Sequence, residues 1–572
     1  MRENREIAHT FDTLADLLEI EGANPFRVRA YRNAARVVDS ISQNVAMMVR
    51  EGRDLSQYPG IGKDLAGKIR TVSETGTLPL LEEVEKRVPR ALSELTQIEG
   101  LGPRRVKALH ESLQVNSLED LEKAVDQGRV RELPGFGART EELVRNGLKR
   151  LRGTQGRTLI ADAEETAVHL ERFLSGLQGV KQVTVAGSYR RRRETVGDLD
   201  VLVTCRPGVP VGKWFTSFES VETILSQGET RSSVRLRSGL QVDLRVVPEI
   251  SYGAALHYFT GSKAHNIAIR KLGMARGLRI NEYGVFSGDQ RIAGRTEAEV
   301  FAAVDLPFIE PELREDRGEV DAARNGRLPE LIRIEDIRGD LHAHTNATDG
   351  RSGLESMVDA ARERGYEYLA ITDHSQAVTV AKGLDVERLR KQLQAIDRLQ
   401  EQYDDIRILK GSEVDILEDG RLDLPDEILR ELDITVCSVH SRFNLPEAQQ
   451  TERILRAMDN PHFRILGHPS GRLLNKRDPY PMDLERIITG AVERGRFLEV
   501  NAQPDRLDLT DTACQLAKEK GAKLAISTDA HSDSGLAGIR FGIGQARRGW
   551  LEKQDVINTR PLPELLKLLR NT

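Results

Sequence analysis

The chain has 572 residues, 39% of them hydrophobic and 30% charged, and a formal net charge of −5. Because domains usually hold about 100–200 residues, this length excludes a single ordinary core and predicts several domains. The sequence has neither a run of about 18 apolar residues for a membrane span nor an apolar signal-peptide core in its charged N-terminal segment, so we expect a cytoplasmic protein.

The three cysteines, Cys205, Cys437 and Cys514, limit the chemistry of any metal site. They are too few and too far apart for a disulfide framework or a CxxC zinc site. Any bound metal ion must therefore be held by histidine and carboxylate side chains.

The negative net charge does not exclude binding to a polyanion, because phosphate binding needs a local basic patch and not a basic total. Residues 27–36 hold four arginines together with Tyr31, and residues 190–193 are four consecutive arginines. Either segment taken alone is equally consistent with a solvated helix face.

A weak repeat runs through the first 150 residues, where "YPGIGKDLAGKI", "IEGLGPRRVKAL" and "LPGFGARTEELV" each join a Gly-x-Gly turn to a helical apolar pattern. Such a turn exposes N–H groups at the positive end of a helix, where they attract phosphate without reading bases. One copy is usually a plain connector, but three copies resemble the helix-hairpin-helix motifs of DNA-binding proteins. The predicted DNA-binding glycines are Gly60, Gly62, Gly100, Gly102, Gly135 and Gly137.

The segment "VTVAGSYRRRRETVGDLDVLVT", residues 183–204, predicts two apolar strands around a basic turn. Side chains two apart on a strand face the same side, so Asp198 and Asp200 project together and repel each other unless a divalent cation lies between them. Asp243, in "GLQVDLRVV", taken alone would be a strand-edge residue, but beside this pair it is a third candidate ligand for Mg²⁺ or Mn²⁺. Such a set suits two-metal phosphoryl transfer to a 3′-hydroxyl.

The motifs "GSYRR", "GDLD", "YFTGSKAHN" and "GLRINEYGVF" occur in that order. Together they closely resemble the family X DNA polymerases, the family of DNA polymerase beta, over about residues 1–310. The resemblance implies that Asp198, Asp200 and Asp243 are the catalytic metal ligands of the palm, with Asp243 also the base for the primer hydroxyl. It implies nucleotide contacts from Gly187, Ser188, Arg191, Tyr258, Phe259, Gly261, Lys263, Asn266 and Arg270.

Two positions qualify this resemblance. Lys263 stands where the vertebrate members carry an acid, so a positive charge would hold the incoming nucleotide more tightly. Lys68 matches the place of a lysine that forms a Schiff base with a 5′-deoxyribose phosphate, with Arg27 and Tyr31 in the neighbouring helix. A solvated helix lysine is an equally good interpretation of Lys68, because Schiff-base chemistry needs a depressed lysine pKa.

After about residue 310 a polar, acidic segment without a β pattern is expected to connect two halves of the chain. From residue 338 onward, seven apolar runs alternate with amphipathic helical stretches: "GDLHAH", "EYLAITDH", "RILKGSEVDI", "DITVCSVH", "FRILGHP", "RFLEVNA" and "KLAISTDAH". Seven strand–helix units in a row predict a parallel α/β structure, most economically closed as a barrel.

Ligand-type side chains stand at the ends of these strands, which form one face in a parallel barrel. A lone histidine there is usually a capping or packing residue, but six of the 12 histidines of the chain occupy such positions. Nine ligands exceed what one ion requires, so two or three ions of Mn²⁺, Zn²⁺ or Fe²⁺ are expected. The candidate ligands are His342, His344, Asp349, His374, Glu413, His440, His468, Asp529 and His531.

The spacing HxH, D, H, E, H, H, DxH resembles the PHP (polymerase and histidinol phosphatase) domain over about residues 338–572. This resemblance implies phosphoesterase chemistry, in which a metal-bridged hydroxide attacks phosphorus. The combination with a family X core resembles the bacterial form of these polymerases.

The expected architecture is therefore multidomain, with helical, α+β and α/β parts. The predicted domains are a small helical DNA-binding, lyase-like domain at 1–85, a helical domain with two further hairpins at 86–155, a nucleotidyltransferase palm at 156–250, a thumb-like subdomain that binds the nascent base pair at 251–310, a linker at 311–337, and a PHP domain forming a distorted (β/α)₇ barrel at 338–572.

The predicted function is filling of short gaps in base excision repair by template-directed nucleotidyl transfer, together with 3′→5′ exonuclease activity of the PHP domain. Incision at apurinic sites and removal of 3′-phosphates are open alternatives for the same metals. The expected partners are gapped or nicked duplex DNA and dNTPs, for a nucleoid-associated monomer. Two other hypotheses stay open: mainly a metal-dependent nuclease with a weak or inactive polymerase core, or an active polymerase with a structural PHP domain.

Overall fold

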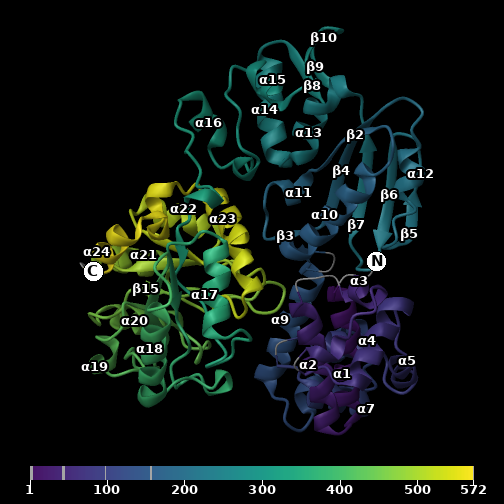
Figure 1. Ribbon diagram of the computed structural model, residues 1–572. Coiled ribbons are helices and arrows are strands. Elements are labelled where there is room, and N and C mark those ends of the chain that lie inside the picture. Colours follow the sequence, from purple (N-terminus) through teal and green to yellow (C-terminus); the bar gives the residue numbers. More distant parts are fainter. Residues whose placement is uncertain are drawn as a thin grey trace. The chain divides into compact units, whose positions relative to one another are not determined.

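The computed structural model describes residues 4–41, 45–58, 60–96, 98, 100–154 and 157–570. It divides into two compact units (Figure 1). The first unit holds Met1–Gly156 and Asn475–Arg477, and the second holds Arg157–Leu474 and Asp478–Thr572. The predicted domain boundary between residues 155 and 156 lies outside the described residues. No helix in the described ranges is both long and apolar enough to cross a membrane.

The first unit is helical around a core that includes Phe11 and Tyr31, whose ring centroids lie 6.2 Å apart. Its α-helices are α1 (Asn4–Glu21), α2 (Pro25–Ser40), α3 (Val45–Arg50), α4 (Lys63–Thr75), α5 (Pro79–Glu85), α6 (Ala91–Leu95), α7 (Pro103–Leu113), α8 (Leu118–Asp126) and α9 (Ala138–Thr154). Two 3₁₀ turns are η1 (Leu55–Gln57) and η2 (Val130–Glu132).

The three glycine turns each lead into a helix, as the repeat predicts: α4, α7 and α9 begin directly after Gly62, Gly102 and Gly137. The first glycine of each turn has a positive φ, which a residue with a Cβ rarely adopts. The residue between the two glycines is apolar and buried in all three copies, namely Ile61, Leu101 and Phe136. This buried side chain anchors the turn to the core.

The second unit begins with a five-stranded sheet of order β2-β4-β7-β6-β5, in which only the β4–β7 pair is parallel. Strands β1 (Thr158–Leu159) and β3 (Thr195–Val196) form a separate two-stranded sheet. The other elements of this part are α10 (Ile160–Ser175), β2 (Val180–Val185), α11 (Gly187–Arg190), β4 (Asp198–Cys205), α12 (Val211–Phe215), β5 (Val221–Ser226), β6 (Arg231–Leu236) and β7 (Gln241–Val246). The parallel register sets Asp200 beside Asp243.

Three α-helices and a small antiparallel sheet of order β10-β9-β8 follow. The elements are η3 (Glu249–Ser251), α13 (Tyr252–Thr260), α14 (Lys263–Ala275), β8 (Leu278–Asn281), β9 (Gly284–Ser287), β10 (Gln290–Ala293) and α15 (Glu297–Ala302). A separate apolar cluster around Phe301 and Ile269 holds this part together.

The segment 311–337, expected as a linker, is folded and packed within the second unit. It contains η4 (Pro311–Leu313), α16 (Glu319–Arg324) and η5 (Ile334–Asp336). Two of its charged residues pair in the interior: buried Arg314 contacts Glu297 at 2.5 Å, and buried Glu319 contacts His265 at 2.7 Å. Other charged residues of the segment, such as Glu330 and Arg333, are exposed.

The remaining chain forms seven parallel strands that pair in sequential order, β11 to β17, and confirms the predicted α/β fold. The strands are β11 (Gly339–Asp340), β12 (Tyr368–Ile371), β13 (Arg407–Asp415), β14 (Ile434–Ser438), β15 (Ile465–Leu466), β16 (Phe497–Asn501) and β17 (Leu524–Ser527). A parallel bridge between Ala343 and Ala530 joins the segments that follow the first and last strands, so the barrel is nearly closed.

Helices cover the outside of this barrel (Figure 1, green to yellow). They are α17 (Leu354–Glu363), α18 (Val386–Gln400), α19 (Asp426–Leu429), α20 (Glu447–Met458), α21 (Leu484–Glu493), α22 (Asp511–Glu519) and α23 (Ile539–Arg548), with short turns η6 (Thr379–Ala381), η7 (Ser534–Gly538), η8 (Lys553–Asp555) and η9 (Ile557–Thr559). Leu565 and Leu569 of the last helix, α24 (Leu562–Arg570), pack with interior residues of the strands, so one end of the barrel is apolar. The polar residues gather at the other end.

Candidate active sites

The first candidate site is a set of three carboxylates on the palm sheet. Asp198 and Asp200 lie two apart on β4, and Asp243 lies on the adjacent β7. Burial, together with the charges of Asp198 and Asp243, raises the pKa of Asp200 to about 7. Burial and the Asp243 charge also raise the pKa of Asp198. A divalent cation would relieve this repulsion, so the residues fit the expected Mg²⁺ or Mn²⁺.

Asp243 is held by two neighbours that the sequence did not suggest. Ser233 donates its hydroxyl to Asp243 Oδ1, and Gln241 Nε2 donates to Oδ2 at 2.9 Å. Among the described residues, groups of three or more potential ligand atoms that lie within 4.8 Å of one another occur only in the barrel. The palm carboxylates are therefore adjacent, but their oxygens do not all lie within 4.8 Å of one another.

The glycine turn before β4 faces these carboxylates. A Cβ on Gly187 would lie 2.8 Å from Asp200 Oδ2, so only glycine fits beside it. Ser188 lies in the following short helix α11, and Arg191 caps its C-terminus. Arg191 Nη1 donates to the Thr260 carbonyl at 2.5 Å and would lie 3.1 Å from a Cβ on Gly261.

The other predicted nucleotide contacts lie on α13 and α14. The Arg270 guanidinium lies 5.0 Å from the centre of the Tyr258 ring, which contacts the Phe259 ring edge-on. Asn266 Nδ2 donates to the Tyr258 carbonyl at 2.7 Å. Lys263, the first residue of α14, is exposed. The structure thus brings Tyr258, Asn266 and Arg270 together and joins Arg191 to Gly261.

Lys68 in the first unit lies on α4, 2.5 Å from Asp64 and 5.3 Å from the centre of the Tyr31 ring. Burial lowers the pKa of Lys68, but hydrogen bonds to Asp64 and Tyr31 outweigh this effect and the pKa is raised. A raised pKa disfavours the free amine that Schiff-base formation needs.

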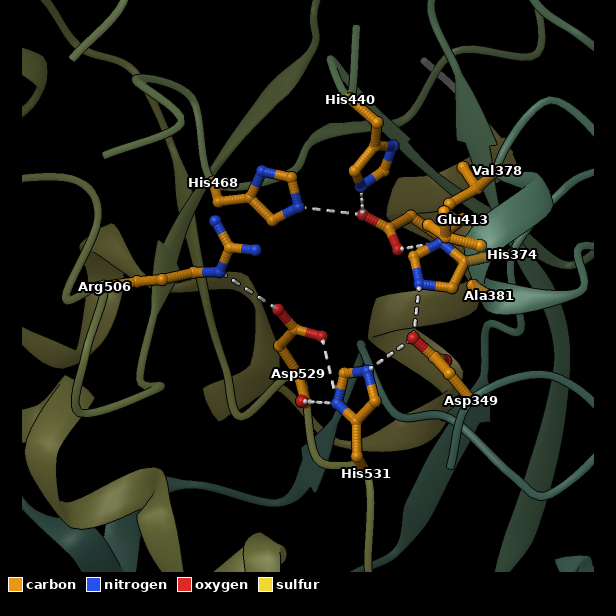
Figure 2. Close-up of a pocket in the computed structure, with 11 residues that line it drawn as sticks. Asp349, His374, Val378, Ala381, Glu413, His440, His468, Arg506, Asp529 and His531 are labelled. Carbon is orange, nitrogen blue, oxygen red and sulfur yellow. Dashed lines mark hydrogen bonds and ion pairs between the residues drawn. The ribbon is translucent and has the colours of Figure 1, made fainter. Parts of the chain in front are cut away.

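The second candidate site lies at the polar end of the barrel, where the nine predicted ligands converge. Seven of them line the pocket shown in Figure 2, and His342 and His344 join this set through Asp529. Three overlapping groups could each hold a metal ion: His344, Asp349, His374 and His531; His342, His344 and Asp529; and His374, Glu413 and His440. His468 Nε2 joins them through Glu413 Oε1 at 2.9 Å. Residues separated by almost the whole barrel in sequence therefore share one centre.

The electrostatics of this centre fit bound cations. The surrounding histidines, outweighing burial, hold the pKa of Glu413 and of Asp529 well below the usual range. Burial opposes ionisation of His374, but Glu413 and Asp349 raise its pKa to about 10. His344 Nδ1 and His468 Nδ1 are buried without a hydrogen-bond partner in the described structure. Metal ions would replace the shared protons and use such orphaned nitrogens.

Supporting residues orient the ligands, and the sequence did not reveal them. Glu499 on β16 contacts His342 Nδ1 at 2.7 Å and accepts from the His468 backbone N–H at 2.6 Å. Asp415 contacts His440 Nδ1 at 3.1 Å. A carboxylate on the second nitrogen of a ligating histidine fixes its tautomer and orientation.

Asp373 differs from its neighbour His374, although both follow β12. Its carboxylate accepts from Thr345 N at 2.9 Å and Thr345 Oγ1 at 2.6 Å, and from Thr348 and Gln392. It therefore supports the segment after His344 and does not point at the ligands.

The pocket over the ligands has a volume of about 240 Å³. Arg506 lies at its wall, with Nε 3.8 Å from Asp529 Oδ2 (Figure 2). Val378, Val380 and Ala381 form an apolar part of the lining. Val380 is almost fully exposed. Carboxylates, imidazoles, an apolar surface and the Arg506 guanidinium thus face the same space.

Family models match successive parts of the chain. The Helix-hairpin-helix domain model matches residues 2–78 and the SAM-like Helix-hairpin-helix tandem model matches residues 92–150. The DNA polymerase beta palm and DNA polymerase beta thumb models match residues 161–227 and 255–315. The PHP domain model matches residues 340–503.

Individual proteins are similar over different shares of the chain. "DNA polymerase/3′-5′ exonuclease PolX" of Bacillus subtilis (strain 168) is 37% identical over 570 residues, 99% of both chains. A "Probable phosphatase" of Thermoanaerobacter sp. (strain X514) is 29% identical over 232 residues, 38% of this chain and 90% of its own. "DNA polymerase lambda" of Arabidopsis thaliana is 26% identical over 348 residues, 54% of this chain and 62% of its own.

Proposed function

The chain belongs to the PolX family of DNA polymerase/3′-5′ exonucleases, and from this membership we propose that it extends a primer strand at the palm and hydrolyses DNA 3′ ends at the barrel. The observation that carries the proposal is the coexistence of two complete sets of candidate ligands. One comprises Asp198, Asp200 and Asp243, and the other comprises the nine side chains of the barrel.

At the palm, Asp198, Asp200 and Asp243 would hold Mg²⁺ or Mn²⁺, which supplies charge neutralisation for the triphosphate and activation of the 3′-hydroxyl. Ser188 and Arg191 are suited to contact phosphate oxygens, because a hydroxyl and a guanidinium both donate hydrogen bonds. We assign Asp243 the proton of the primer hydroxyl. The Tyr258 and Asn266 side chains, on consecutive helices, would flank the sugar and base of the nucleotide.

At the barrel, bound Mn²⁺, Zn²⁺ or Fe²⁺ supplies a hydroxide nucleophile and Lewis acidity for hydrolysis of a phosphodiester. Glu499 and Asp415 orient His342 and His440, so that the donor atoms face the pocket. Arg506 is the cation of the pocket wall and would hold a non-bridging phosphate oxygen. The apolar wall at Val378 and Val380 would lie against the sugar or base of the terminal nucleotide.

The partners follow from these sites. We propose gapped or nicked duplex DNA and dNTPs as ligands, with the three glycine turns of the first unit contacting backbone phosphates independently of sequence. Short gaps fit this arrangement, because hairpin motifs can hold duplex on both sides of a gap. The protein would act as a monomer in the cytoplasm, at the nucleoid.

A second candidate activity of the barrel is removal of a 3′-phosphate. The similarity to the probable phosphatase, which covers 90% of that protein, supports it. Incision at apurinic sites uses the same phosphodiester chemistry. In all three activities a DNA 3′-oxygen leaves the phosphorus, and the activities differ in whether the phosphate is terminal, is joined to an ordinary nucleotide or is joined to an abasic sugar. Because they share the proposed metal site, one set of variants tests them together.

The decisive experiment uses a labelled duplex with a one-nucleotide gap, Mn²⁺, and the full chain with and without dNTPs. The variant Asp198→Ala/Asp200→Ala is expected to lose extension only, and His342→Ala/His344→Ala is expected to lose degradation only. Matched controls are Asp289→Ala, at an exposed aspartate, and His462→Ala, at a histidine outside the pocket.

Each competing hypothesis has its own outcome. A wild-type protein that degrades but does not extend supports a nuclease with an inactive palm. Unchanged degradation, dephosphorylation and incision by the histidine variant support a structural barrel. Metal content of wild type and the histidine variant, measured in parallel, shows whether the barrel holds ions at all.

A further inference from the structure

We infer that the barrel provides Arg548 as a positioning residue for the nucleotide site of the palm, acting on Arg191 through Glu315. This inference rests on the proposed role of Arg191 as a triphosphate contact. Arg191 directly follows α11 in the palm, Glu315 follows η4, and Arg548 is the last residue of the barrel helix α23. The three residues are far apart in the sequence, and all lie within the second unit.

One carboxylate oxygen joins the two arginines. Glu315 Oε1 lies 3.0 Å from Arg191 Nε and 2.9 Å from Arg548 Nη1. Arg548 Nη1 also donates to the Arg191 main-chain carbonyl at 2.9 Å. Arg548 therefore holds both the partner of the Arg191 side chain and the backbone from which that side chain extends.

The three side chains are largely withdrawn from water, with exposed fractions of 12% for Arg191, 10% for Glu315 and 3% for Arg548. Charge-assisted hydrogen bonds are strong in such surroundings, and leaving one partner unpaired is costly. The contacts therefore fix the geometry far better than surface ion pairs would.

Arg548 is itself fixed from the barrel side. Its Nη2 lies 2.6 Å from Asp511 Oδ2, at the first residue of α22. Arg317 Nη2, from the segment after the thumb, lies 3.0 Å from the same oxygen. The chain of contacts from Asp511 to Arg191 is continuous, so the position of the barrel helices is transmitted to the palm turn.

This fixed geometry leaves part of the Arg191 guanidinium for a ligand. Nε binds Glu315 and Nη1 binds the Thr260 carbonyl, whereas Nη2 has no hydrogen-bond partner in the described part of the protein. A planar guanidinium held at two nitrogens presents its third in a defined direction. Without Arg548, the Glu315 carboxylate would pair only with Arg191 and with Arg193, whose Nη1 lies 3.7 Å from Oε1. The direction in which Arg191 presents its Nη2 would then no longer be fixed.

A second ion pair between the barrel and the palm serves as a matched control. Arg540, also on α23, lies 2.6 Å from Glu164 Oε2, and Glu164 also binds Arg192. Arg540 does not contact Arg191 or Glu315. Removing it breaks a link between the same two parts without touching the triphosphate arginine.

The test is steady-state single-nucleotide gap filling by the full chain, with KM for dNTP and kcat measured for wild type, Arg548→Ala, Arg548→Lys and Arg540→Ala. We expect Arg548→Ala to raise KM about tenfold, corresponding to roughly 1.4 kcal/mol, with a small change in kcat. Arg548→Lys should recover part of this loss, and Arg540→Ala should leave KM unchanged. Degradation of 3′ ends by Arg548→Ala should remain near wild type, because Arg548 does not line the barrel pocket.

An unchanged KM in Arg548→Ala, or an equal rise in Arg540→Ala, overturns the inference. Arg191→Ala separates it from the proposed function: an unchanged KM there removes the triphosphate role of Arg191, whereas a raised KM in Arg191→Ala alone removes only the role of Arg548. If Arg548→Ala does not fold, Glu315→Gln tests the same link, and an unchanged KM in that variant also overturns it.

Discussion

At the scale of single residues, Asp200 makes the palm sensitive to pH. Its pKa is about 7 in the protein without metal, because of burial and the charges of Asp198 and Asp243. The proton and the metal compete for the same carboxylate. We therefore expect the Mg²⁺ concentration for half-maximal extension to fall as pH rises from about 6 to 8, across the pKa of Asp200.

The pH dependence of folding stability has the opposite direction to that of Mg²⁺ binding. An aspartate ionises at about pH 3.9 in the unfolded chain, so between that value and the raised pKa the unfolded state binds fewer protons, and stability without metal falls as pH rises. Arg245 lowers the pKa of Asp200, so Arg245→Gln should move the Mg²⁺ profile to higher pH. A profile that is flat in wild type contradicts the assignment.

Glu499 gives a second prediction at this scale. Glu499→Gln removes the carboxylate that orients His342 and should reduce hydrolysis and metal affinity about 10–100-fold, leaving extension intact. Hydrolysis rate and metal content are the measurements, with the exposed Glu493→Gln as control. Loss of extension together with hydrolysis would indicate misfolding instead.

The candidate metal ligands of the barrel were predictable from the sequence, but the residues that orient them were not. Nine ligand-type side chains at strand ends stand out because histidine is rare elsewhere in the chain. Glu499 lies within a strand, 157 positions from His342, and nothing local distinguishes it from other strand residues. Likewise, Asp373 and His374 are adjacent in sequence, but only contacts show that they point to different neighbours.

At the scale of elements, we predict different effects for alanine at two glycines of the first unit, one in a glycine turn and one inside a helix. Gly100 has φ +87°, so alanine there is strained by about 1–2 kcal/mol although its Cβ would meet only the end of Arg105. Gly67 lies inside α4 with open space around it, so alanine there should be neutral or stabilising. Gly100→Ala should therefore weaken binding to gapped duplex for every sequence, and Gly67→Ala should not.

The measurement is fluorescence anisotropy with duplexes of two unrelated sequences. A loss of binding restricted to one DNA sequence would contradict backbone contact, and equal loss in both variants would point to general destabilisation.

Periodicity and turn chemistry were sufficient to predict these elements from the sequence, because each glycine turn is specified locally. The same holds for the seven barrel strands, whose apolar runs match β11 to β17.

At the scale of the whole molecule, long-range charge pairing was beyond sequence analysis. The polar composition of residues 311–337 predicts a linker, and within it Arg314 and Glu319 are buried with partners from other elements. Glu315 and Arg548 are 233 residues apart, and their role depends on packing of the barrel against the palm. Composition cannot separate a buried ion pair from two solvated charges.

Metal binding should consequently stabilise the second unit. The barrel centre buries Glu413, Asp529 and several histidines, whose charges balance only through shared protons when no cation is present. A ligand that binds only the folded state stabilises it by about 2.7 kcal/mol at 100 times its Kd. We expect calorimetry to show that chelator-treated protein unfolds at a lower temperature and that Mn²⁺ restores the original transition temperature.

Two variants locate the stabilising ions. His342→Ala/His344→Ala should lose most of this Mn²⁺ response, whereas Asp198→Ala/Asp200→Ala should retain it, because the latter leaves the barrel ligands unchanged. An equal response in all three proteins would mean that the stabilising ions bind elsewhere.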